Sequence, residues 1–201
     1  KEDNMKNPLS THFFNGIINM HDTIDAGVTT VRDCGLADIG AKMAQKKGLF
    51  PSPKMLLSVT PLSITGGHFD LTFNSGFNMG IKYPGLPNPL CDGVENVIRK
   101  TREVFRARAD FIKVMVTGGA LSENDSSLYP QFNLKELIAI VKEAKMRKSK
   151  VAAHAHGLEG IKNAFKAGVN SIEHGTYIDK SLAKLMAKKG TPISATITVI
   201  D

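Results

Sequence analysis

Two histidines and one lysine in the second half of the chain have the residue types and spacing of a metal-binding site. Lys113 interrupts an apolar run, and His154 and His174 lie near the ends of the next two apolar runs, 151–157 and 171–175. Burying an isolated charge is unfavourable, so a lysine within a strand usually has a specific role. Neutral imidazoles are common ligands of zinc and similar divalent ions. The pattern therefore predicts a divalent-metal site assembled from three consecutive strands.

Lys113 has two possible chemical roles. Burial lowers the pKa of an amine, and the neutral amine can add carbon dioxide to form a carbamate, an anionic ligand able to bridge two metal ions. A neutral lysine can instead form a Schiff base with a carbonyl substrate. In this second respect the stretch 110–119 resembles the lysine strand of deoxyribose-phosphate aldolase, a class I aldolase. The aldolase interpretation gives the two histidines no role.

The remaining histidines are less informative on their own. His68 follows two glycines, and its pattern leaves a turn and a substrate contact equally open. His156 lies just before a predicted helix, where it either begins the helix or faces the site. His12 and His21 fall on the first predicted helix and are expected to be structural or solvent-facing.

Alternating strand and helix patterns run through the chain and must position these side chains. Strands are expected near 28–32, 54–60, 111–116, 151–157, 171–175 and 192–196, and helices near 9–26, 36–47, 93–108, 133–147, 158–167 and 179–189. The strands are apolar throughout, as in parallel sheets that helices cover on both faces. No Gly-x-Gly-x-x-Gly fingerprint is present, so a (β/α) barrel is favoured over a doubly wound sheet. A full barrel has eight strands, so this one is expected to be two strands short.

The chain is expected to form one partial barrel domain, 1–201, with one long irregular insertion. That insertion, 61–92, contains the Gly-Gly-His sequence, several asparagines and a cluster of prolines. A long connection without regular structure in a compact α/β domain is usually a binding loop or a lid.

Composition excludes several classes of function. The net charge of +7 comes largely from lysines and arginines on predicted helices such as 135–148 and 180–189, where they alternate with apolar residues. This is the pattern of solvated helix faces, so no nucleic-acid partner is expected. No apolar run is long enough to cross a membrane. Cys34 and Cys91 are too few for a disulfide framework, which favours a reducing, cytoplasmic location.

Taken together, these motifs resemble the amidohydrolase superfamily, in particular its imidazolonepropionase-like and Xaa-Pro or Xaa-Arg dipeptidase (prolidase-type) branch. The matching segments are 26–33, 65–68, 112–119, 151–157 and 167–175, in the order that the family has them. The resemblance implies a distorted, TIM-like (β/α)8 barrel of the metal-dependent hydrolase type, with two divalent ions, usually zinc. Here the barrel would be incomplete, with about six strands, lacking the first and the last.

The same resemblance implies a role for each candidate residue. Lys113 would be the carboxylated lysine that bridges the two ions, while His154 and His174 would complete the second metal site. His68 and His156 would face the substrate, stabilising the scissile carbonyl or holding a carboxylate. The implied reaction is attack by metal-activated hydroxide on the amide bond of a dipeptide or N-acyl amino acid.

Three family features are missing from the chain. They are the His-x-His pair of the first strand, the metal-binding aspartate of the eighth strand and the small β-sandwich formed by both chain ends. We therefore expect a fragment of a longer enzyme, with a non-catalytic fragment or assembly module as the alternative. Unclosed sheet edges favour self-association, so a homo-oligomer is expected.

Overall fold

The structure is a computed structural model that describes residues 7–80, 83–120 and 125–197. Its helices are α2 (Leu9–Asp25), α3 (Ile39–Lys46), α4 (Val94–Arg106), α5 (Leu134–Met146), α6 (Leu158–Ala167) and α7 (Lys180–Lys189). Its strands are β1 (Thr30–Asp33), β2 (Lys54–Leu57), β3 (Ile112–Met115), β4 (Val151–Ala155), β5 (Ser171–His174) and β6 (Ile193–Ser194). All twelve elements were predicted from the sequence, and most strands are shorter than expected.

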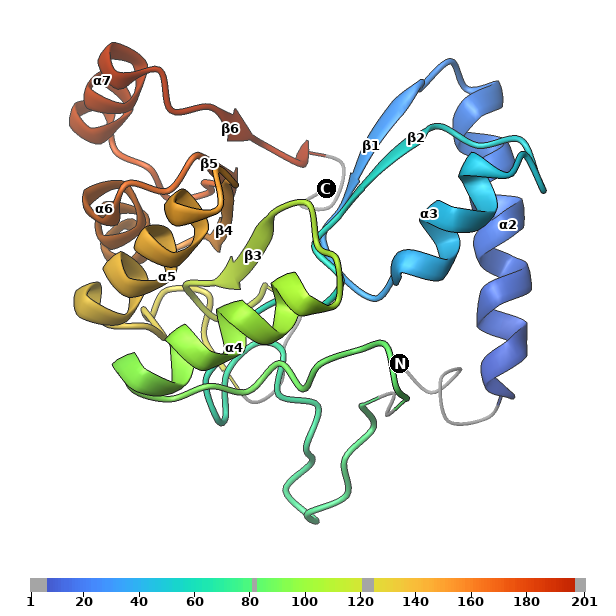
Figure 1. The fold of residues 1–201 in the computed structure, drawn as a ribbon. Helices are drawn as coiled ribbons and strands as arrows, with labels where there is room; N and C mark the ends of the chain where they lie inside the picture. Colours follow the sequence, from blue (N-terminus) through green and yellow to red (C-terminus); the bar gives the residue numbers. More distant parts are fainter. Residues whose placement is uncertain (1–6, 81–82, 121–124, 198–201) are drawn as a thin grey trace.

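The strands form an open, parallel half-barrel. β1 pairs with β2, and the second sheet has the order β3-β4-β5-β6, with every pairing parallel. A parallel bridge between Leu62 and Val114 carries the chain after β2 alongside β3. Helices α4 to α7 cover one side of the four-stranded sheet, whereas α2 and α3 lie beside β1 and β2 (Figure 1). The prediction of an incomplete α/β barrel is confirmed.

Local sequence signals explain where the helices begin and end. Asn133 accepts a hydrogen bond from the backbone of Glu136, whose side chain bonds back to the Asn133 backbone, so α5 begins with a capping box. Asp179 caps α7 through the backbone N–H of Leu182. Gly168 ends α6 with φ of 86°, a conformation that glycine adopts without strain.

Apolar residues of β3, β4 and β5 form the core with the inner faces of their helices. All four residues of β3 and all five of β4 are buried. In contrast, α2 is a helix as predicted, but none of its residues is buried. The lysines and arginines of 135–148 and 180–189 are exposed, so the prediction of solvated helix faces is confirmed.

Asp110 joins the two sheets at the amino end of β3. Its Oδ2 atom accepts hydrogen bonds from the Leu57 backbone N–H at 2.8 Å and from the Lys42 amine at 2.6 Å. The Asp110 backbone N–H in turn donates to the Leu57 carbonyl. These bonds hold β2 next to β3 even though the chain between them, 58–111, contains both the 61–92 connection and α4.

That connection contains no helix and no strand in its described part, only isolated bridges. Its role as a lid remains a prediction. Both cysteines are free thiols, as expected. Within the described ranges, none of the helices combines the length and apolar character needed to cross a membrane.

Candidate metal centre

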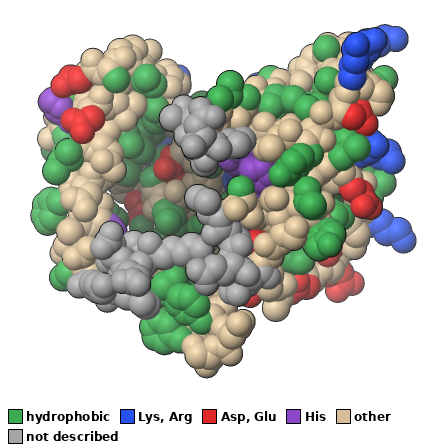
Figure 2. Space-filling view, turned by 180° about the vertical axis from the view of Figure 1, so that it is seen from behind, with side chains coloured by type: hydrophobic (Ala, Val, Ile, Leu, Met, Phe, Trp, Pro, Cys, Tyr) green, Lys and Arg blue, Asp and Glu red, His purple; other side chains and the backbone are tan. Residues whose placement is uncertain are grey.

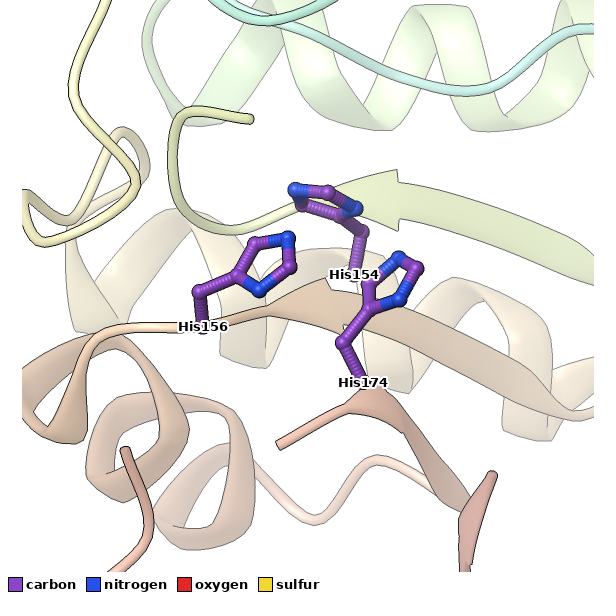
Figure 3. Close-up of side chains that lie close together, drawn as sticks. All are labelled: His154, His156 and His174. Carbon is purple, nitrogen blue, oxygen red and sulfur yellow. The ribbon is translucent and has the colours of Figure 1, made fainter. Parts of the chain in front are cut away.

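Three histidine side chains converge at the carboxyl ends of β4 and β5. The rings of His154, His156 and His174 point toward one another (Figure 3), and one nitrogen from each lies within 4.8 Å of the others. A space-filling view shows histidine side chains at the edge of a hollow between the α2–α3 side and the four-stranded sheet (Figure 2). Carboxyl strand ends are where parallel barrels carry their functional residues.

His154 is fixed by the backbone on one side of its ring. Its Nε2 atom lies 3.0 Å from the Gly118 carbonyl oxygen. Because a carbonyl only accepts hydrogen bonds, Nε2 carries the proton and Nδ1 keeps its lone pair. Burial lowers the pKa of His154 to about 2, so the ring is neutral at physiological pH. A neutral imidazole with a free lone pair is a metal-binding form.

His156 lies just beyond β4 and is held by two threonines. Its backbone N–H donates to the Thr117 hydroxyl at 3.0 Å, and its Nδ1 lies 2.8 Å from Thr176 Oγ1. The ring stacks on that of His174 with centroids 4.5 Å apart. Burial lowers the pKa of His156 as well. The structure thus places His156 with the two predicted ligands.

An unusual backbone conformation brings His174 into the cluster. In the sheet register, Glu173 pairs with His154 and His174 with Ala155, so alternation alone would point Glu173 and His174 to opposite faces. His174 instead has φ of 76°, a conformation unfavourable for a residue with a side chain. Burial lowers its pKa to about 4. Strained backbone of this kind is concentrated at functional sites.

Lys113 is buried inside β3, with 3% of its surface exposed. Burial lowers the pKa of its amine, and its charge in turn lowers the pKa values of the three clustered histidines. Within the described part of the chain, its amine forms no hydrogen bond. The amine is therefore near enough to the three histidines to act on their pKa values, and it has no ion-pair partner in contact among the described residues.

Arg32 and Glu173 form a charged pair across the barrel interior that the sequence analysis did not identify. Both guanidinium Nη atoms of Arg32 on β1 lie 3.0 Å from Glu173 Oε1, and Nη2 lies 3.1 Å from Oε2. The Ser171 hydroxyl donates to the same carboxylate at 2.8 Å. Despite the burial of Glu173, which raises its pKa, these two donors lower it overall. The pair ties the two sheets together one residue away from His174.

His68 reaches the cluster from the 61–92 connection. Its ring stacks on that of His154, with centroids 4.4 Å apart. Its backbone N–H donates to Gln131 Oε1 at 3.0 Å, and its Nδ1 lies 3.9 Å from Asp125 Oδ2. A Cβ atom at Gly119 would overlap the His68 ring, so glycine is required there. The long connection thus places a fourth imidazole beside the three.

The donor set fits a divalent metal ion. The five candidates predicted from the sequence, namely Lys113, His154, His174, His68 and His156, lie in one region of the barrel. Neutral nitrogen donors suit zinc and similar ions. The threonine and carbonyl contacts of the three clustered rings are the kind of outer contacts that orient metal-binding imidazoles. Which of the five side chains bind metal remains a prediction.

Several residues that shape the site gave no usable signal in the sequence. Thr176 and Thr196 contact the Nδ1 atoms of His156 and His174. Each follows its histidine partner by about twenty residues in an ordinary loop sequence. The Arg32–Glu173 pair is separated by 141 positions. A separation of this length gives no local sequence pattern that would identify the two residues as partners.

This chain is a parallel half-barrel with histidines gathered at the carboxyl ends of β4 and β5 and a lysine buried inside β3. These features define the class of barrel proteins with a functional site at that end. The Amidohydrolase family model matches residues 8–201. The chain belongs to the amidohydrolase family, as its motifs indicated, and not to the aldolases.

Three relatives illustrate the similarity. Ochratoxinase from Aspergillus niger is 38% identical over 192 residues, which cover 90% of this chain and 40% of the relative. The crystal structure of A. niger ochratoxinase has a TM-score of 0.85 at 33% identity, covering 98% of this chain and 48% of that one. The structure of a prolidase complexed with N-methylphosphonate-L-proline has a TM-score of 0.84 at 32% identity, and the match covers 94% of this chain and 47% of the prolidase chain. The structure of a Xaa-Pro dipeptidase with bound methionine has a TM-score of 0.74 at 39% identity, and the match covers 85% of this chain and 42% of the dipeptidase chain.

These relatives agree with the prolidase-like branch expected from the motifs. The chain spans less than half the length of each of them. A fragment of a larger amidohydrolase therefore fits the comparisons.

Proposed function

We propose that the whole protein hydrolyses the amide bond of a dipeptide or N-acyl amino acid with the help of a divalent metal, and that this metal is zinc, which suits nitrogen donors. The proposal is carried by one observation. His154, His156 and His174 converge, and the buried Lys113 is near enough to act on their pKa values. Relatives that include a prolidase and a Xaa-Pro dipeptidase support an amide substrate.

Lys113 has the properties that carboxylation requires. Its burial lowers the pKa of the amine, which raises the fraction of the neutral, nucleophilic form at physiological pH. Addition of carbon dioxide forms a nitrogen–carbon bond, releases one proton and converts the amine to a carbamate anion. An anion in place of the cation suits a pocket of imidazoles that bind positive metal ions. In this proposal Lys113, His154 and His174 hold the metal.

When bound, a divalent ion supplies a Lewis acid that polarises the amide carbonyl and activates water. His154 and His174 hold their donor atoms in place through the Gly118 carbonyl and Thr196. His156 and His68, at the sides of the cluster, are proposed to contact the substrate carbonyl or carboxylate. As a neutral ring, His156 can donate or accept a hydrogen bond there.

Replacement of His174 in the whole protein tests the proposal. We expect His174→Ala to lower kcat/KM for a panel of dipeptides and N-acyl amino acids at least about 100-fold, since loss of a ligand exceeds loss of an outer contact. His21→Ala is the matched control, because His21 is exposed on α2 and contacts Asp25. Chelation should abolish activity and zinc should restore it.

A second treatment separates hydrolase from aldolase chemistry. Borohydride reduces Schiff bases, so it should leave the protein unmodified in the presence of sugar phosphates. Unchanged turnover of the His174→Ala variant, or trapping of a substrate on Lys113, would contradict the proposal.

Self-association is a further part of the proposal. β1 and β6 lie at the ends of their sheets in the described chain, where unpaired backbone groups favour contacts with another copy. Size-exclusion chromatography of this chain, residues 1–201, should show a species larger than a monomer. A monomer at all concentrations would contradict it.

A further inference from the structure

A pocket of about 480 Å³ lies between the 61–92 connection and the loop after β1. This volume is within the range of small-molecule sites. Its walls are mainly apolar, and they include Leu36, Phe69, Leu71, Tyr83, Leu86 and Leu90. Among the described residues that line it, none is a lysine, arginine or histidine, so these residues offer no counter-charge for a carboxylate or phosphate.

The polar side chains on these walls are already bonded to other residues. Asp70 accepts hydrogen bonds from the backbones of Gly66 and Thr72 at 2.8 and 3.1 Å. Asn78 bonds to the Thr72 hydroxyl and to the Gly80 backbone. Because their hydrogen bonds are used within the connection, these groups shape the pocket without demanding a polar ligand. An apolar ligand fits these walls best.

Thr60 is the exception among the polar groups. It lines the pocket with 2% of its surface exposed, and its hydroxyl has no hydrogen-bond partner within the described residues. Burying an unpaired hydroxyl is unfavourable. Thr60 follows β2, so it lies at the end of the half-barrel where the histidines also lie.

The pocket wall and the histidine cluster are neighbours in the chain. Phe69 lines the pocket, and the preceding residue, His68, stacks on His154. Consecutive Cα atoms are about 3.8 Å apart. The 61–92 connection thus carries a pocket-lining residue directly after one that contacts the cluster, although none of the five site candidates is among the described lining residues.

Contacts outside the pocket hold its outer wall in place. The Tyr83 hydroxyl donates to Asp38 Oδ2 at 2.7 Å, and Asp38 caps α3 through two backbone N–H groups. The Tyr83 ring also packs edge-on against Phe13 of α2, with centroids 6.1 Å apart. The wall is thus anchored to two helices, as expected of a largely preformed binding pocket.

We propose that this pocket binds an uncharged, apolar side chain of the substrate, of leucine or phenylalanine size, next to the scissile amide. The inference rests on the proposed function and specifies its substrate class. Leu71 and Phe69 are then specificity-determining residues. Glycine at the same substrate position leaves the pocket empty. Lysine moves an ammonium group from water to walls whose one charged group among the described residues, the Asp70 carboxylate, already accepts two backbone hydrogen bonds.

A series of N-acetyl amino acids tests the pocket in the whole protein. N-acetyl-L-leucine and N-acetyl-L-phenylalanine should be hydrolysed with kcat/KM about 10- to 100-fold above those of N-acetylglycine and N-acetyl-L-lysine. Leu71→Trp fills the pocket and should remove this preference, so that the four substrates are hydrolysed with similar kcat/KM. Phe77→Trp is the matched control, because Phe77 is 58% exposed on the same connection and lies outside the pocket lining.

Binding measured by calorimetry on metal-free protein gives a readout independent of hydrolysis. If Leu71→Trp hydrolyses none of the four substrates, Leu71→Ala is measured in its place. This variant enlarges the pocket, so its substrate preference should move from leucine toward phenylalanine. Equal use of all four substrates, a preference for lysine, or the same change in Leu71→Trp and Phe77→Trp would overturn the pocket assignment while hydrolysis stands. Selective binding without hydrolysis would contradict the hydrolase proposal and leave the pocket assignment standing.

Discussion

His174 and Thr196 hold each other in place at the carboxyl ends of β5 and β6. His174 Nδ1 lies 2.6 Å from Thr196 Oγ1. Both residues have left-handed backbone conformations, with φ of 76° and 46°. Neither is a glycine, so each conformation is unfavourable on its own and must be maintained by surrounding contacts. The hydrogen bond occupies Nδ1 of His174. The other ring nitrogen, Nε2, is therefore the atom available to a metal.

Removing the Thr196 hydroxyl should weaken metal binding without unfolding the protein. We expect Thr196→Ala to lower zinc affinity by about 10- to 100-fold, since outer contacts of metal-binding histidines typically contribute that much. Zinc titration with a competing chelator measures the change. Thr196→Ser keeps the hydroxyl and should bind zinc nearly as well as the wild type. Equal affinities of the alanine and serine variants would contradict the role of this bond.

Replacing Lys113 by methionine should separate stability from metal binding. In metal-free protein the variant exchanges a buried amine for an apolar side chain of similar length, so its free energy of unfolding should equal that of the metal-free wild type or exceed it by up to about 2 kcal/mol. Its metal content and activity should fall sharply. Urea unfolding and elemental analysis measure the two effects.

Lys113→Arg is the matched control for that variant. A guanidinium stays charged at every accessible pH, so burying it should lower the free energy of unfolding. The account fails if arginine is tolerated and methionine is strongly destabilising, because the native amine would then be charged and paired.

The stability of the metal-free protein should fall as the pH drops from 6.5 to 4.5. The pKa values of His154 and His174 are lowered by burial from 6.5 to about 2 and about 4. Below pH 6.5, the unfolded chain therefore binds protons that the folded chain excludes, and the equilibrium moves toward unfolding.

Urea unfolding at several pH values between 4.5 and 7.5 measures the slope. A variant with His154→Asn and His174→Asn should show a much smaller dependence in the same window. The prediction is wrong if the wild type and this variant have the same slope.

Breaking the Arg32–Glu173 pair should destabilise the half-barrel. Arg32→Met leaves the buried Glu173 carboxylate with Ser171 as its remaining donor, and we expect the free energy of unfolding to fall by about 1–3 kcal/mol. The estimate is modest because Arg32 is 38% exposed. Adding Glu173→Gln removes the uncompensated charge and should restore part of the loss.

Arg102→Met provides the comparison for that pair. Arg102 bonds to Glu143 on the outer helices and is 57% exposed, so its loss should matter much less. Equal effects of Arg32→Met and Arg102→Met would show that the interior pair has no special role.

Periodicity and turn residues were sufficient to predict the order of helices and strands. Gly168 and Gly190 end α6 and α7 close to the predicted bounds, and the continuous apolar runs of β3 and β4 indicated a covered parallel sheet. The site candidates followed from one rule, that side chains at the carboxyl ends of successive parallel strands meet. His154 and His174 follow that rule, because they lie at the ends of β4 and β5. Lys113 lies inside β3, and alternation along the strands put it on the same face as His154.

Other features depend on distances that sequence spacing does not encode. Alternation predicts that Glu173 and His174 point to opposite faces, and only the left-handed φ of His174 brings both inward. His68 and His154 are 86 positions apart in the sequence, and their stacking depends on how the 61–92 connection folds over the strand ends. Long-range contacts made by irregular segments are therefore the part that sequence patterns miss.

Metal content is the most direct test of the central claim. Elemental analysis of the whole protein, purified without added metal, should find about two divalent ions per chain. The variant with His154→Ala and His174→Ala should lose at least one of them, while His21→Ala should keep the wild-type content. Absence of metal from the wild type, or unchanged content in the double variant, would contradict the assignment of these histidines and Lys113 to a metal centre.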